Sequence, residues 1–175
     1  MLQHAILTAM GADRPGLVAE VSQFLFESGA NIEDSRMVNL RGQFAMVVLL
    51  SGDDAVMTSI RGKLDAFSQS SHMKTMLTPV PARAVEPMAA MPYRLTATAM
   101  DQAGLVHHIA ALLRKLNVNI ESMETVLSPA PITGAPMFEM ELLMSMPRQT
   151  PIGKLREELG KLCDELNIDY QLSAL

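Results

Sequence analysis

The sequence predicts an α+β protein made of two copies of one small domain, each a four-stranded antiparallel sheet with two helices on one face. Three observations support this prediction: a motif that occurs twice, alternating strand and helix patterns within each copy, and a proline-rich segment between the copies. The motif joins Leu-Thr-Ala, Asp-x-x-Gly-Leu-Val and Asn-Ile-Glu, and it returns after 88 positions. Residues 7–38 and 95–126 align without a gap and are identical at 12 of 32 positions. A repeat of this length is typical of paired domains.

The first copy opens with a strand and a helix. Residues 4–10 form the strand, and 11–16 are turn residues. The segment from Leu17 onward carries apolar side chains at helical spacing, and Gly29 favours the end of that helix.

The rest of the first copy predicts a hairpin, a second helix and a last strand. Residues 31–40 and 44–50 are strand-like and flank Arg41-Gly42, which can turn. Asp53-Asp54 can cap a helix whose apolar positions recur every three or four residues, and 72–78 make the last strand. The order is βαββαβ.

The second copy repeats this order and carries six additional residues in its hairpin, within the proline-rich stretch 128–136. Such a loop is a contact surface or a lineage feature. The predicted elements are a strand at 93–100, a helix at 104–116, strands at 119–127 and 137–145, a helix at 152–166 and a strand at 168–172.

The βαββαβ order predicts the ferredoxin-like fold, in which right-handed crossovers place both helices on one face of the sheet. We therefore expect a first domain at 1–80, a linker at 81–91 and a second domain at 92–175. Four prolines between Pro79 and Pro92 oppose both helix and central strand in the linker.

Composition narrows the classes of function. The chain has 175 residues and a net charge of −5, and both halves are acidic, which disfavours direct binding of nucleic acid. A single cysteine, Cys163, allows no intrachain disulfide, and the chain shows no apolar run of membrane-spanning length. The N-terminal residues lack the pattern of a signal peptide. We expect a cytoplasmic protein.

The junction between the first strand and the first helix is the main candidate site. A helix start presents free backbone N–H groups that can receive a carboxylate, and Gly16 permits close approach of a ligand. Asp13 and Asn31 offer oxygen atoms for an ammonium group. Alternatively, Asp13 only caps the helix, Pro15 only fixes its first turn and Gly16 only allows tight packing. The candidate ligand-binding residues are Asp13, Arg14, Pro15, Gly16, Leu17, Val18, Asn31 and Ile32.

The second copy keeps the acid and the glycine of this junction, but Gln102 and Ala103 replace Arg14 and Pro15. We expect a ligand-competent first copy and a second copy that serves mainly as a structural and partner surface. The weaker candidates are Asp101, Gly104, Leu105, Asn119 and Ile120.

The motif and the order of elements around it resemble a known family. The pattern of a strand, Asp-x-Pro-Gly-Leu-Val, an amphipathic helix and Asn-Ile is similar to the ACT domain, a small regulatory module that binds amino acids. The first copy, through 13–16, 31–36 and 49–52, further resembles the glycine cleavage system transcriptional repressor family, whose members are tandem ACT repeats.

The resemblance implies a regulator without enzymatic activity. It would control transcription by contacting a protein such as a transcription factor, sense a small amino acid such as glycine, and form a dimer. A free-standing amino-acid-binding regulator of a metabolic enzyme is the alternative from the same fold. Neither reading requires a cofactor.

Residues that suggest catalysis have simpler explanations. His107 and His108 lie about 100° apart on a helix, so they do not share a metal-binding face. Cys163 lies beside a leucine stripe, as inert buried thiols do. Glu139 and Glu141 alternate with apolar residues, which is typical of a solvated strand face. We expect no metal site and no catalytic residues, although an enzyme using Asp13, Asn31 and the histidines is the alternative of another class.

Overall fold

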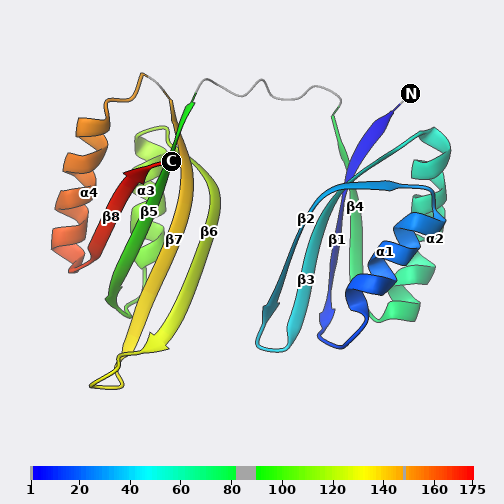
Figure 1. The fold of residues 1–175 in the computed structure, drawn as a ribbon, viewed down its shortest axis with the longest axis horizontal. Coiled ribbons are helices and arrows are strands. Elements are labelled where there is room, and N and C mark those ends of the chain that lie inside the picture. Colours follow the sequence, from blue (N-terminus) through cyan, green and yellow to red (C-terminus); the bar gives the residue numbers. More distant parts are fainter. Residues whose placement is uncertain (1, 82–89, 148) are drawn as a thin grey trace. The chain divides into compact units, whose positions relative to one another are not determined.

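The computed structural model describes residues 2–81, 90–147 and 149–175. Its chain divides into two compact units, Met1–Val85 and Glu86–Leu175. In each unit, two helices cover one face of a four-stranded antiparallel sheet (Figure 1). The fold predicted from the sequence is therefore confirmed.

The first unit has the order βαββαβ, and its strands lie in the sheet as β2-β3-β1-β4. The consecutive strands β2 and β3 form a hairpin. Helix α1 connects β1 to β2, and helix α2 connects β3 to β4. The elements are β1 (Gln3–Ala12), α1 (Leu17–Glu27), β2 (Asn31–Leu40), β3 (Gln43–Gly52), α2 (Asp54–Ser71) and β4 (Lys74–Val80).

Side-chain alternation on the central strands explains the core of the first unit. Every second residue of β1 and β3 points toward the helices and is buried, including Leu7 and Leu50. Leu25 of α1 and Ile60 of α2 meet them at 0% exposure. Replacing such a buried leucine by alanine costs about 2–5 kcal/mol.

The second unit repeats the order and the sheet arrangement, as β6-β7-β5-β8. Its core again combines alternate strand residues with one stripe from each helix, including Leu113 and Leu159. The elements are β5 (Ala90–Met100), α3 (Leu105–Lys115), β6 (Asn119–Pro129), β7 (Pro136–Pro147), α4 (Ile152–Leu166) and β8 (Asp169–Ala174).

Several details differ from the predicted elements. The last strand of the first unit was expected from residue 72, but His72 ends α2 in a left-handed conformation with φ 56°. Strands β6 and β7 extend to Pro129 and Pro136, so the additional residues form a tighter turn than the predicted loop. Most of the linker expected at 81–91 lies outside the described residues, and its last two residues belong to β5. Within the described ranges, no helix is long and apolar enough to cross a membrane.

Candidate functional site

The loop between β1 and α1 is fastened to the tip of the β2–β3 hairpin through Asp13. The backbone N–H of Asp13 donates to the carbonyl of Gly42 at 2.8 Å, and Asn39 Nδ2 donates to the Asp13 carboxylate at 2.5 Å. The backbone N–H of Gly42 in turn donates to Asn39 Oδ1. Asp13 therefore connects two loops and does not cap α1, so that alternative from the sequence is wrong.

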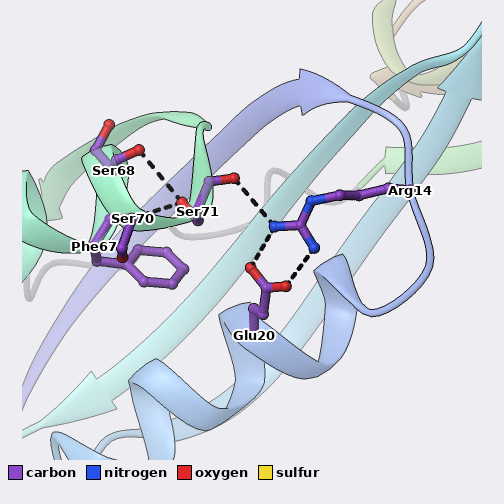
Figure 2. Close-up of polar contacts among 6 residues, drawn as sticks. All are labelled: Arg14, Glu20, Phe67, Ser68, Ser70 and Ser71. Atoms are coloured by element: carbon purple, nitrogen blue, oxygen red, sulfur yellow. Dashed lines mark hydrogen bonds and ion pairs between the residues drawn. The ribbon is translucent and has the colours of Figure 1, made fainter.

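Arg14 reaches from the same loop across to both helices (Figure 2). Its Nη2 donates to Glu20 Oε2 at 2.7 Å, and its Nη1 forms the second arm of a bidentate ion pair. Nη2 also donates to the backbone carbonyl of Ser71 at the end of α2, at 3.3 Å. The hydrogen bond from Arg14 is the main cause that lowers the pKa of Glu20. The guanidinium thus already holds a carboxylate of its own chain.

The start of α1 has no side-chain cap. Gly16 occupies the N-cap position with φ 96°, a left-handed conformation that favours glycine. The first recorded helical bond runs from the N–H of Glu20 to the carbonyl of Gly16. Within the part of the chain that the structure describes, the backbone N–H groups of residues 17–19 donate to no protein acceptor. These donors, at the positive end of the helix dipole, can receive an anionic group.

Pro15 and the two apolar residues of this motif have distinct positions. Pro15 precedes the N-cap, so it does not occupy the first helical position that the alternative reading gave it. Leu17 is buried in the core, whereas Val18 is exposed beside the helix start. Of the two, Val18 is therefore the side chain that a bound molecule can touch.

Asn31 and Ile32 lie at the opposite end of the sheet from Asp13. Asn31 pairs with Ser51, which pairs with His4, whereas Asp13 follows the last residue of β1. The two levels are nine residue steps apart along the chain, from His4 to Asp13, or about 30 Å. Asp13 and Asn31 of one unit therefore do not meet around one small molecule.

The second unit builds the same kind of helix start. Gly104 is the N-cap of α3 with φ 97° and again no side-chain cap, and Leu105 behind it is buried. The N–H of Asp101 donates to the carbonyl of Pro136 at the hairpin turn, at 3.0 Å. Gln102 Nε2 donates to the carbonyl of Leu166 at the end of α4, at 2.9 Å. The geometry of the junction therefore survives the changes in its sequence.

The side chain nearest each N-cap glycine differs between the units. The residue four positions after the glycine is Glu20 in α1 and His108 in α3. An added Cβ on Gly104 would lie 3.4 Å from the His108 ring, and one on Gly16 would lie 3.9 Å from a Glu20 oxygen. The first helix start thus carries a carboxylate and the second an imidazole.

Asn119 and Ile120 lie at the start of β6, where the strand has a β-bulge like that of β2. Asn119 Nδ2 and the Ser145 hydroxyl both donate to Glu121 Oε1, and these bonds lower the pKa of Glu121. In the first unit the equivalent Glu33 instead pairs with His4, at 3.2 Å. A shallow hollow of about 360 Å³ lies beside Asn119 and Ile120.

A second shallow hollow, of about 400 Å³, lies between α1 and α2. It is lined by Arg14, Glu20, Gln23, Phe24, Glu27, Phe67 and Ser70. The rings of Phe24 and Phe67 stack at its base with centroids 4.3 Å apart.

The other reactive side chains are not assembled into a catalytic site. His107 and His108 are exposed, and Cys163 is buried, which raises the pKa of its thiol to about 11. Glu139 accepts a hydrogen bond from Ser128, and Glu141 pairs with Arg94. Among the described residues, no group of three His, Cys, Asp or Glu side chains could hold a metal ion.

Sequence reasoning missed the two partners that fix the first loop, Glu20 and Asn39. Glu20 had a local signal, since an acid in the first turn of a helix lies within reach of an arginine just before it. Asn39 had none, because its contact with Asp13 forms only when the hairpin folds beside the loop.

The fold of the first unit agrees with that of a known domain family. Residues 3–78 match the family model of the ACT domain. The second unit has the same order of elements and the same sheet arrangement. The first unit is therefore an ACT domain, as the resemblance implied, and the second unit repeats its fold.

Individual relatives extend the similarity over the whole chain. The chain is 27% identical over 172 residues to the glycine cleavage system transcriptional repressor of Escherichia coli, covering 98% of this chain and 90% of that protein. The crystal structure of an unknown protein from Galdieria sulphuraria has a TM-score of 0.81 at 27% identity, with 100% and 99% of the chains covered. A UPF0237 protein of Streptococcus pneumoniae is 37% identical over 71 residues, which are 40% of this chain and 81% of that one.

Proposed function

We propose that this protein is a non-enzymatic regulator of amino-acid metabolism that controls transcription through protein contact and senses a small amino acid. The similarity to a glycine cleavage system transcriptional repressor along 172 residues is the observation that carries the proposal. The acidic balance of both halves favours a protein partner over direct contact with DNA.

The amino acid would bind at the helix-start loops. The free N–H groups of residues 17–19 would receive its carboxylate, and the absence of Cβ on Gly16 lets it approach the backbone. One oxygen of the Asp13 carboxylate already accepts a hydrogen bond from Asn39. The other oxygen would receive the ammonium group. Arg14 would position the loop, because its guanidinium is already paired with Glu20.

Asn31 and Ile32 would contribute to the same ligand only from another domain. They lie about 30 Å from Asp13 along the sheet of their own unit. A ligand that touches both a helix-start loop and the beginning of a second strand would therefore need the second contact from another copy of the chain. This requirement agrees with the expectation that the protein forms a dimer.

Calorimetric titration of the full chain with glycine, serine and other small amino acids tests the sensing role. Asp13→Ala should weaken binding by about tenfold or more, since it removes the acceptor proposed for the ammonium group. Asp101→Ala is the matched variant in the second unit and should have the smaller effect if the first unit is the main site. No heat with any amino acid would remove the sensing role, and a larger loss with Asp101→Ala would reverse the order of the sites.

Partner capture from a native lysate separates the regulatory readings. Recovery of a helix-turn-helix regulator supports transcriptional control. Recovery of a metabolic enzyme supports the alternative, an ACT-domain regulator of that enzyme. Turnover of a bound amino acid would contradict both and favour an enzyme.

A further inference from the structure

The open face of the first sheet, which the helices do not cover, is largely apolar, with the polar Thr8 between Val47 and Met76. The register places the even-numbered residues of β1 and the odd-numbered residues of β3 on this face. Met10, Val47 and Met76 are 56%, 45% and 59% exposed. The large apolar residues of the face are Ile6, Met10, Val38, Leu40, Val47, Leu49, Met76 and Val80.

The second unit supplies an internal reference, because its open face has the same backbone and different chemistry. The position of Val47 is taken by Glu141, and that of Ile6 by Arg94. On the helix-facing side of the same strands the chemistry is unchanged, as the buried pair Phe44 and Phe138 shows. The fold therefore does not require an apolar open face.

Charged groups of the first open face lie at its edges. His4 and Glu33 pair at one end of the sheet, and Asp34 pairs with Arg36 on the edge strand β2. The register places Arg36 beside Val47 and Asp34 beside Leu49, so this ion pair borders the apolar centre directly. Lys74 begins the other edge strand. An apolar centre within a charged rim is the usual anatomy of a protein interface.

We propose that this open face of the first sheet binds the same face of a second copy of the chain. Two copies of an apolar surface with charges at its rim can pack centre to centre without burying an unpaired charge. A partner with central carboxylates would have to lose the hydration of those carboxylates against Val47, which is unfavourable. Three strands of ten residues, each about 33 Å long, and one of seven residues, about 23 Å long, lie about 4.8 Å apart and present about 600 Å² per copy. Two copies bury about 1,200 Å², which reaches the size of a specific interface.

Sedimentation of the full chain at micromolar concentrations tests this face. The wild type should approach twice the monomer mass of 19.1 kDa as the concentration rises. Val47→Glu introduces the residue that the second unit carries at the equivalent position, and it should raise the dissociation constant by about 100-fold or more. Phe26→Glu is the matched control, because Phe26 is an exposed apolar residue on α1, away from the sheet face. It should leave the dissociation constant unchanged.

Several results would overturn the proposal. They are a wild-type chain that stays at 19.1 kDa throughout, a Val47→Glu variant that dimerises as tightly as wild type, and a Phe26→Glu variant that weakens the dimer equally. Circular dichroism reports whether each variant is folded. If Val47→Glu does not fold, Ile6→Arg, which again introduces the residue of the second unit, is measured in its place. The proposal is independent of amino-acid sensing, so either can fail alone.

Discussion

Arg14 and Gln102 occupy equivalent positions in the two units, and each donates a hydrogen bond to a carbonyl at the C-terminal end of its unit's second helix. The acceptors are the carbonyls of Ser71 and Leu166, at 3.3 and 2.9 Å. An arginine and a glutamine thus perform the same mechanical task. What only Arg14 adds is the ion pair with Glu20.

This equivalence predicts how the first loop responds to substitution. Arg14→Gln should keep the loop ordered, because glutamine makes the corresponding bond in the second unit. Arg14→Ala should release it, which hydrogen exchange would detect as faster exchange of the amides at 13–17. Both variants should lower the melting temperature by at most about a few degrees, because the ion pair is on the surface. Equal exchange in both variants would contradict the mechanical role.

The ion pair also predicts a dependence on pH. The hydrogen bond from Arg14 lowers the folded-state pKa of Glu20 below its ordinary value of 4.5. The unfolded chain therefore takes up the proton first, so the stabilisation is complete well above 4.5 and is lost as the pH falls through the lowered pKa. Thermal melts of wild type and Glu20→Gln should differ at pH 7 and converge as the pH falls below that lowered pKa. A difference that persists undiminished as the medium is acidified would have another origin.

The N-cap glycines predict a contrast between two glycine-to-alanine substitutions. Gly16→Ala places a Cβ at φ 96° and should destabilise the protein by about 1–2 kcal/mol. Gly62→Ala lies within α2 with no atom near the added Cβ, and it should stabilise the protein by about 0.5–1 kcal/mol. Denaturant titration measures both. A neutral Gly16→Ala would show that the helix start relaxes easily.

Cys163 predicts slow chemical modification. It is 1% exposed, and burial is the main cause that raises its thiol pKa to about 11. Because the thiolate is the reactive form, labelling with a disulfide reagent at pH 8 should be at least about 100-fold slower than in denaturant. The chain has one cysteine, so the absorbance of the thiol released from the reagent reports the labelling of this residue alone. Fast labelling of the folded protein would show that α4 opens locally.

Most of the fold could be predicted from the sequence because the repeat presents each pattern twice. Helical spacing and strand alternation identified every element, and Asp53 caps α2 as expected, accepting from the N–H of Val56 at 2.9 Å. The start of β4 was misplaced because His72 adopts a left-handed conformation that the strand-like pattern around it does not reveal.

The candidate site was harder to predict because it depends on topology. Asp13 and Asn31 lie close in the sequence motif, but α1 carries the chain back along the sheet before β2 begins. The βαβ connection by itself predicts that Asp13 and Asn31 lie at opposite ends of the sheet. The partner of Asp13, in contrast, depends on where the hairpin tip comes to lie.

The N-cap glycines leave the first helix of each unit less stable than a side-chain cap would make it. Relative to a glycine N-cap, a serine or aspartate typically stabilises a helix by about a few tenths of a kcal/mol, and neither α1 nor α3 has such a side-chain cap. In both units, the first N–H groups of the helix have no acceptor among the described residues. The same donors are left without a partner at equivalent places in two domains whose sequences have otherwise diverged. Any solute that offers a hydrogen-bond acceptor there can supply the missing stabilisation.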